Sequence, residues 1–332
     1  MPSFALSRAS RRDFLQAAAL AAGAATSLST LAQPADGRKT DTVRLGWGRG
    51  GLTLIAKVRG DFERRLAAQG IKVQWVGPFP NHAPSLQAVT GGSADFGFGG
   101  STTPALAAIL AGSPLVFTQF AVVEPRSTAI IAKDGSGIAR VEDLVGKTVA
   151  VNRSGLGEFL LVAALEKHGV ARDQVRVVYL NPPEAGPAFS QGKVDAWSMW
   201  SPGVDIARSE YQAHDIFFEG RDLDFLIDFN SWVTTRRFAE DNPGLVRAVN
   251  AAFAEEGRWA EAHTLEAETI NQKEAGYSDA VRDHQVAYQR RWQFHGVDDQ
   301  SFLTGFQKAA DWLSARKILP RPVKVAEHLA RL

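Results

Sequence analysis

The chain has 332 residues, of which 45% are hydrophobic and 22% are charged, with 30 glycines and 15 prolines. These values are typical of a globular protein and exclude a disordered or collagen-like chain, and the length predicts more than one hydrophobic core. Lys and Arg total 37 against 36 Asp and Glu, without a long basic run, which argues against nucleic acid as a partner. The sequence contains no cysteine. Disulfides, thiolate metal sites and thiol nucleophiles are therefore excluded.

Residues 1–32 are predicted to be an export signal. The run Ser-Arg-Arg-Asp-Phe-Leu-Gln at residues 10–16 resembles the twin-arginine motif, and an alanine-rich apolar stretch follows it at residues 17–25. This stretch is too short and too weakly apolar for a transmembrane helix. We expect cleavage after Ala32, export by the twin-arginine route and a mature protein in the periplasm.

From residue 41 onward, predicted strands alternate with predicted helices, as in βα units. A first set has strands at 43–47, 72–76 and 95–99 and helices at 52–66, 86–89 (the end of a short helix) and 104–110. A second set has strands at 148–152, 175–180 and 194–199 and helices at 159–168 and 184–191. Two copies of one plan predict two lobes.

The segments between and after the two sets predict how the lobes are joined. Extended stretches at 116–123 and 128–132 flank Pro125, which makes this region a candidate hinge. After the second set, another extended stretch at 225–234 leads into helices at 243–262, 264–275 and 302–316. We therefore expect residues 41–124 plus 225–332 to form lobe 1 and residues 125–224 to form lobe 2. A chain that crosses twice allows the lobes to close on a ligand.

Two glycine motifs are incomplete as nucleotide-binding sites. Residues 46–51 read Gly-x-Gly-x-x-Gly between a strand and a helix, but the next strand ends at Val76 without the acidic residue that a dinucleotide requires. Gly146-Lys147-Thr148 resembles the end of a phosphate-binding loop, but Val141 replaces its first glycine. The sequence therefore predicts no cofactor.

Motifs for hydrolytic or metal chemistry are also incomplete. The seven histidines form no His-Glu-x-x-His pair, so no metal site is expected. Ser154 follows Asn-Arg instead of the Gly-x that precedes the serine of a nucleophile elbow. We therefore expect a binding protein and not an enzyme.

Three strand-to-helix junctions are rich in glycine and hydroxyl residues: residues 49–51, 100–104 and 153–155. Each follows the carboxyl end of a predicted strand, where open α/β sheets bind ligands, and each begins a helix whose free N–H groups favour an anion. Thr103 is expected to be a helix N-cap, with Pro104 in the first turn. The alternative is that these hydroxyl groups only cap helices.

Four stretches, at 43–51, 86–100, 141–151 and 179–202, give the chain a family resemblance. They resemble the periplasmic substrate-binding proteins of ABC importers for nitrate, sulfonate and taurine, and most closely the aliphatic-sulfonate-binding group. The resemblance implies a type II periplasmic-binding-protein fold of the α/β class. Each of its two lobes has a mostly parallel sheet flanked by helices, and a two-stranded hinge joins them. It also implies a monomer that delivers a small anionic ligand to a membrane permease.

Carried over by position, the resemblance implies a set of ligand-binding residues: Arg49, Gly51, His82, Ser101, Thr102, Thr103, Ser154, Gly155, Trp197, Trp200, Asn230 and Trp232. Sulfonate binders of this group usually read Gly-Asp-Thr-Pro where this chain has Gly100 to Pro104, and often have Gln at position 49. The lost carboxylate argues against a ligand amine, whereas Arg49 favours a sulfonate or carboxylate.

A second feature of the implied site is aromatic. Tryptophans at positions 47, 197, 200 and 232 and Phe79 would form an apolar wall, which favours an aromatic or longer-chain sulfonate. The alternatives are a nitrate, bicarbonate or thiamin-precursor receptor, or a desulfinase-like enzyme on the same lobes that uses Arg49 and His82 as proton donors. Nitrate needs no aromatic wall, and desulfinases of this lineage use a cysteine that this chain lacks.

Overall fold

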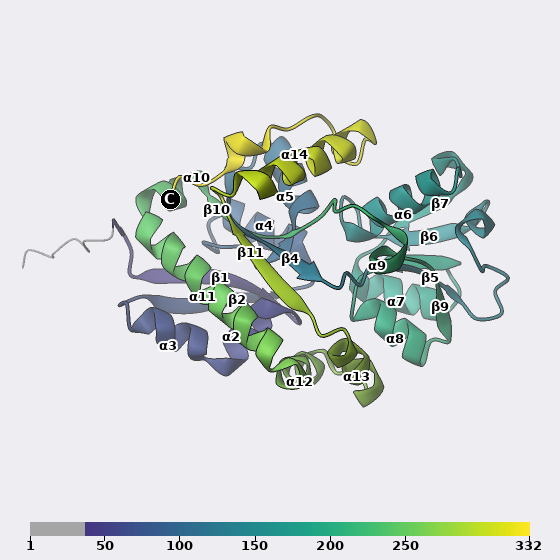
Figure 1. Cartoon of the computed structure of the whole chain (residues 1–332), viewed down its shortest axis with the longest axis horizontal. Helices are drawn as coiled ribbons and strands as arrows, with labels where there is room; N and C mark the ends of the chain where they lie inside the picture. The colour runs from purple at the N-terminus through teal and green to yellow at the C-terminus, as the bar shows by residue number, and fades with distance from the viewer. Residues whose placement is uncertain (1–36) are drawn as a thin grey trace, which may run out of the picture. The chain divides into compact units, whose positions relative to one another are not determined.

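The computed structural model describes residues 37–332, which form an α/β structure of two lobes (Figure 1). The predicted export signal lies outside these residues. Lobe 1 consists of β1 (Thr42–Gly48), α2 (Leu52–Arg59), α3 (Asp61–Ala67), β2 (Lys72–Phe79), α4 (His82–Thr90), β3 (Gly100–Ser101), α5 (Thr102–Leu110), β4 (Leu115–Glu124), β10 (Asn230–Thr235), α10 (Arg236–Asp241), α11 (Pro243–Ala262), α12 (Thr264–Ala275), α13 (Asp279–Ala287), β11 (Arg291–Gly296) and α14 (Gln300–Ala315).

Lobe 2 consists of β5 (Ala129–Lys133), β6 (Thr148–Val151), α6 (Leu156–Lys167), β7 (Arg176–Tyr179), α7 (Pro182–Ser190), β8 (Ala196–Met199), α8 (Gly203–Glu210) and β9 (Ala213–Phe218), followed by the short helix α9 (Glu219–Asp222). Three 3₁₀ turns lie at Val141–Leu144, Arg172–Gln174 and Val325–His328. In Figure 1, α6 lies on one side of the lobe 2 sheet, and α7 and α8 lie on the other. Among the described residues, none of the helices combines the length and apolar character that a membrane crossing needs.

The sheets are mixed, whereas the sequence predicts mostly parallel ones. Lobe 1 has a parallel pair, β1-β2, and an antiparallel sheet in the order β11-β4-β10-β3. The lobe 2 sheet has the order β7-β6-β8-β5-β9, in which the pairs of β6 are parallel and those of β5 are antiparallel. The antiparallel pair of β4 and β10 arises at the lobe crossing, because the chain leaves lobe 1 after β4 and returns alongside it as β10.

Some predicted elements differ from the observed ones. The helix expected at 52–66 is divided at Gly60, which has a φ of 69° that favours glycine. The strand expected at 95–99 is reduced to one bridge between Leu45 and Phe96, and the ladder pairing begins at Gly100. A Cβ atom at Gly99 would lie 2.6 Å from the Trp232 ring, so close packing displaces regular pairing there. Helices α8 and α13 and strands β9 and β11 were not expected.

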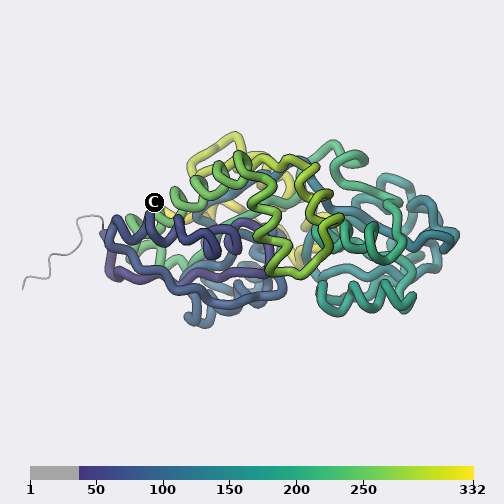
Figure 2. The backbone as a smooth tube through the Cα atoms, turned by 90° about the horizontal axis from the view of Figure 1, so that it is seen from below, coloured from purple at the N-terminus to yellow at the C-terminus, as the bar shows by residue number. Residues whose placement is uncertain are grey.

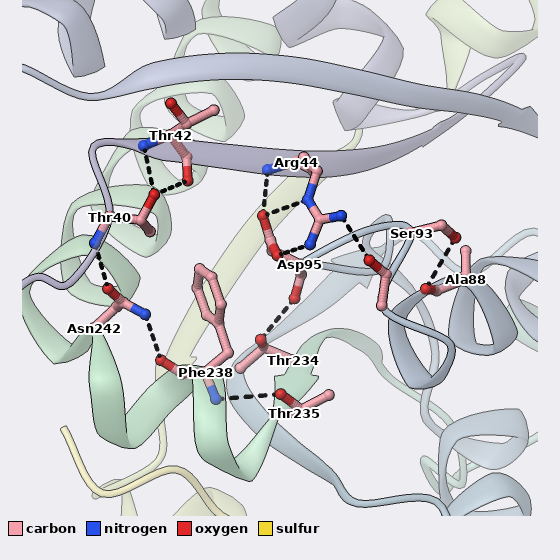
Figure 3. Close-up of polar contacts among 11 residues, drawn as sticks. Thr40, Thr42, Arg44, Ala88, Ser93, Asp95, Thr234, Thr235, Phe238 and Asn242 are labelled. Carbon is pink, nitrogen blue, oxygen red and sulfur yellow. Dashed lines mark hydrogen bonds and ion pairs between the residues drawn. The ribbon is translucent and has the colours of Figure 1, made fainter.

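Asp95 connects β1 to β10 in lobe 1 (Figure 3). Its carboxylate accepts hydrogen bonds from the Arg44 backbone N–H at 2.7 Å and from the Arg44 guanidinium at 2.6 and 3.1 Å. The Thr234 hydroxyl donates to the Asp95 carbonyl at 2.6 Å. These contacts hold the loop before β3 and α5 in place, and this loop leads directly to one of the predicted ligand-binding junctions.

Two segments, residues 125–128 and 219–229, carry the chain between the lobes, and they contact each other. The Arg126 guanidinium donates to the carbonyls of Leu223 and Phe225 at 2.8 and 2.7 Å and lies 3.7 Å from the Glu219 carboxylate. The Glu219 N–H donates to the Thr128 carbonyl at 2.9 Å.

Glu219 makes this crossing sensitive to pH. Burial raises the pKa of Glu219 to about 7 from its ordinary value of 4.5. The folded protein therefore keeps this proton at pH values where the unfolded chain has released it, so stability that is present below pH 4.5 is lost as the pH rises toward 7.

We predict that Glu219→Gln removes this contribution. As the pH rises from acidic to neutral, the free energy of unfolding of the variant should increase relative to that of the wild type by up to about 3 kcal/mol. Urea unfolding of both proteins across this pH range measures the difference. A difference that does not change with pH would contradict the prediction.

Candidate ligand-binding cavity

A cavity of about 1410 Å³ is lined by residues from both lobes and from the two crossing segments. Its volume exceeds the range of about 300–1,000 Å³ that is usual for small-molecule sites. Lobe 1 lines it with the junctions before α2, α4 and α5 and with parts of α12 and α13, and lobe 2 lines it with the junctions before α6, α7 and α8. In Figure 2 the α12–α13 segment lies beside α8, consistent with the hydrogen bonds of Gln285 and Tyr288 to Asp205.

The structure brings most of the predicted ligand-binding residues to this cavity but not all of them. Those that line it are Arg49, Gly51, His82, Ser101, Ser154, Trp197, Trp200 and Asn230. Those that do not are Thr102, Thr103, Gly155 and Trp232. The second group is buried in the lobes, where each residue serves local packing or hydrogen bonding.

The junction before α5 is occupied by an internal carboxylate. Oδ1 of Asp228 accepts hydrogen bonds from the hydroxyls of Ser101 at 2.7 Å, Thr102 at 2.9 Å and Thr103 at 2.9 Å, and from the Thr103 N–H at 3.0 Å. Burial raises the pKa of Asp228, and these donors act in the opposite direction. The hydroxyls that were expected to meet a ligand anion thus bind a carboxylate of the protein itself.

Two expectations about this junction are corrected by the same contacts. Helix α5 begins at Thr102 with Ser101 as the N-cap, so Thr103 is not the cap. The free Thr103 N–H in the first turn of the helix donates to Asp228, which comes from a distant segment of the chain. The local sequence lacks the carboxylate that the family resemblance led us to expect there. The fold nevertheless brings Asp228 to this position, so the argument against a ligand amine no longer holds.

At the junction before α2, Arg49 already has a partner. Its guanidinium donates to Glu274 of α12 at 2.9 Å, and 64% of its side chain is exposed. The Gly51 N–H donates to the Asn271 side chain at 3.1 Å, so α12 also satisfies the start of α2. Arg49 is therefore less available to a ligand anion than the sequence suggests.

The junction before α6 is held by Glu158, which is itself buried. Glu158 accepts hydrogen bonds from the Ser154 N–H at 2.6 Å, from Arg172 at 2.9 Å and from the Tyr179 hydroxyl at 2.8 Å. Ser154 adopts a φ of 50°, a conformation that few residues other than glycine adopt. Glu158 therefore stabilises a strained loop at the edge of the cavity.

Arg153 differs from the other arginines of the cavity. Its guanidinium lies 3.7 Å from the centre of the Tyr179 ring and, among the residues that the structure describes, no carboxylate forms an ion pair with it. Only Ser154 and the N-cap Gly155 separate it from α6, whose N-terminus favours negative charge. This combination suits a ligand anion.

His82 is a neutral structural residue. The residue is 5% exposed and Nδ1 lies 2.8 Å from the Ser101 carbonyl, so Nδ1 carries the proton and donates it. Burial lowers the pKa of His82 to about 4. A Cβ atom at Gly100 would lie 2.5 Å from the ring, which explains the glycine there. Because the imidazole is uncharged at neutral pH, it does not suit the role of a proton donor to a leaving group.

The aromatic wall includes only part of the predicted set. Trp197, Trp200 and Phe79 line the cavity, together with the unpredicted residues Phe98, Tyr211 and Phe229. Trp47 is outside the lining, with the Lys57 ammonium 4.5 Å from the centre of its ring. Trp232 is fully buried.

Trp232 belongs to the core of lobe 1. Its ring centre lies 5.3 Å from that of Phe253 and 5.5 Å from that of Phe294. These ring contacts hold Trp232 inside the core, whereas the hydroxyl of its neighbour Ser231 donates to the Gly100 carbonyl.

Sequence reasoning missed the charged groups that the crossing segments and α12–α13 bring to the cavity. These are Arg126, Glu219, Asp228, Glu268 and Arg290. Their contacts are long-range, and no periodicity or motif marks them; the only signal was the expected crossing at residue 225. In the described part of the chain, no group of three or more acidic or histidine side chains is suited to hold a metal ion.

Two lobes, two crossings and a cavity that both lobes line define the class of the extracytoplasmic solute-binding proteins. Comparison with known proteins gives the family: residues 53–267 match the family model described as NMT1/THI5 like, and the chain belongs to this family. It is 31% identical over 237 residues to a putative aliphatic sulfonates-binding protein of Escherichia coli (strain K12), covering 71% of this chain and 72% of the relative.

Solved structures agree with this assignment. The alkanesulfonate-binding protein SsuA from Xanthomonas axonopodis pv. citri bound to MOPS superposes with a TM-score of 0.79 at 25% identity, covering 88% of this chain and 99% of that protein. The periplasmic aliphatic sulphonate binding protein SsuA from Escherichia coli gives a TM-score of 0.75 at 25% identity, with coverages of 88% and 92%. These findings confirm the predicted fold class. The protein is the solute-binding component of an ABC importer and not an enzyme.

Trp232 and Trp200 have different surroundings, so their replacement by alanine should lower the free energy of unfolding by different amounts. Trp232→Ala should lower the free energy of unfolding by about 3–5 kcal/mol, because it leaves a cavity in the core. Trp200→Ala should cost much less, since this side chain is partly exposed and already borders an open cavity. Urea denaturation measures both. Equal losses would contradict this placement of the two rings.

Proposed function

We propose that this protein captures a small organic anion, an alkyl or aryl sulfonate, and delivers it to the permease of its ABC importer. The observation that carries the proposal is the cavity itself. It combines an apolar aromatic wall with Arg153, a cation at a helix N-terminus without an acidic partner in the described chain. The similarity to proteins named for aliphatic sulfonates supports the same ligand class.

The anionic end of the ligand is assigned to Arg153 and the start of α6. A charge-assisted hydrogen bond contributes about 1.5–3 kcal/mol and a helix N-terminus about 0.3–2 kcal/mol. Micromolar affinity requires about 8 kcal/mol. Contact with the aromatic wall adds to these terms, since covering about 150 Å² of apolar ligand surface contributes roughly 4 kcal/mol. Micromolar affinity therefore requires both the anion contacts and the aromatic wall.

The cellular context follows from the same proposal. The twin-arginine-like segment within residues 1–32 would direct the chain to the periplasm, where a monomer would present the loaded cavity to a membrane permease. The named relatives include a taurine-binding periplasmic protein of Escherichia coli (strain K12), which matches over 180 residues at 30% identity. This relative supports the same compartment.

The alternatives have less support. A nitrate or bicarbonate ion would leave the apolar wall without a partner, and no described feature favours a thiamin precursor. A desulfurization enzyme shares the fold at 17% identity, which concerns the fold alone. The lack of cysteine and the neutral His82 argue against desulfinase chemistry in this chain.

Intrinsic tryptophan fluorescence tests the ligand class, because Trp197 and Trp200 line the cavity. We expect a saturable change with members of a panel of alkyl and aryl sulfonates, and none with nitrate at the same ionic strength. A panel in which no sulfonate changes the emission, confirmed by calorimetry, would refute the proposal.

Replacing arginines separately tests the anion site. Arg153→Ala should weaken sulfonate binding at least tenfold, equivalent to about 1.4 kcal/mol, because it removes the unpaired cation. Arg49→Ala is the matched control and should change the affinity less than about threefold, since Glu274 already neutralises Arg49. Titration calorimetry measures both affinities. The opposite order would assign the anion to the junction before α2.

A further inference from the structure

We propose that the ligand is dipolar, with its sulfonate at Arg153 and a protonated amine at Asp228. This inference rests on the proposed function and specifies the substrate class within it. It depends on two observations about the cavity: how its charged side chains are paired, and how the carboxylate of Asp228 is held.

The pairing of charges leaves one cation and one anion for the ligand. Seven charged side chains line the cavity: Arg49, Arg126, Arg153, Arg290, Glu219, Asp228 and Glu268. Three of the arginines form ion pairs with carboxylates, at 2.9 Å for Arg49, 3.7 Å for Arg126 and 3.2 Å for Arg290. These pairs include both glutamates of the lining. Of these seven side chains, only Arg153 and Asp228 have no ion-pair partner among the described residues.

Asp228 has a carboxylate oxygen that remains available. All four of its hydrogen bonds from the protein go to Oδ1, and no described residue donates to Oδ2. Its side chain is partly exposed and borders the cavity. A carboxylate accepts hydrogen bonds on both oxygens, so a cationic donor in the cavity would complete its set.

The same carboxylate excludes a ligand anion from its surroundings. The N-terminus of α5 and the three hydroxyls would form an anion site, but Asp228 occupies it. A sulfonate placed beside Asp228 would experience like-charge repulsion at low dielectric. The sulfonate therefore faces the junction before α6, and the end that faces Asp228 is positively charged.

This orientation uses both sides of the cavity. Arg153 belongs to lobe 2, whereas Asp228 lies in the segment that returns to lobe 1 and is fixed to the start of α5. A dipolar ligand thus contacts a fixed charge on either side. A simple alkyl sulfonate would leave the Asp228 charge without a counter-ion inside the cavity, which is unfavourable.

A matched pair of ligands tests the inference with the wild-type protein. 3-Aminopropane-1-sulfonate and butane-1-sulfonate have the same heavy-atom count in the chain, with an ammonium in place of a methyl group. We expect titration calorimetry at neutral pH to show at least tenfold tighter binding of the amino compound. Equal affinities, or tighter binding of butane-1-sulfonate, would overturn the inference while leaving the proposed function intact. Failure of both compounds and of the wider panel would refute the proposed function instead.

A charge-neutral substitution assigns the effect to Asp228. Asp228→Asn keeps one acceptor oxygen for the donors of α5 but removes the charge, so it should weaken binding of the amino compound at least tenfold and leave butane-1-sulfonate nearly unchanged. Asp311→Asn makes the same chemical change on the exposed face of α14, outside the cavity lining, so it is the control and should keep the wild-type preference. A thermal melt shows whether Asp228→Asn is folded, and if it is not, the ligand pair with the wild-type protein decides. A folded variant that retains the preference for the amine would overturn the assignment.

Discussion

The cavity depends on the way in which the protein accommodates the Asp228 carboxylate. Removing a charged group from water is unfavourable unless hydrogen-bond donors replace the water, and three hydroxyls and one backbone N–H do so here. The same contacts hold the returning crossing segment against the start of α5. Because β10 begins two residues later, they also set where the chain re-enters the sheet of lobe 1. One electrostatic requirement thus positions a hinge segment and one end of the cavity.

A second consequence concerns the charges that face a ligand. An arginine in a cleft is often regarded as an anion site, but three of the four here already lie at ion-pair distance from a carboxyl group of the protein. The remaining guanidinium lies on the Tyr179 ring, which restricts it without cancelling its charge. The apolar wall of Trp197, Trp200 and Phe79 lies in the same cavity. On the proposed function, selectivity would arise from the few unpaired charges beside this apolar wall.

The sequence predicted local elements more reliably than their pairing. Helix α11 begins and ends where expected, at Pro243 and Ala262, because proline at the first turn and a regular apolar face are local signals. The antiparallel pairing of β4 with β10 was not expected, since it depends on where the chain returns after leaving the lobe. Trp232 illustrates the same difference: its strand was expected, but the face on which the ring lies depends on register.

By itself, the sequence determined the alternation of strands and helices, the two-lobe plan, the absence of thiol chemistry and the resemblance to sulfonate-binding receptors. Each of these follows from composition, periodicity or short motifs, which are properties of neighbouring residues. Only the tertiary structure decided that Asp228 meets Thr103 across 125 positions and that Arg49 meets Glu274 across 225. These pairs decide which charges remain for a ligand. No local pattern records them, because they exist only after packing brings distant segments together.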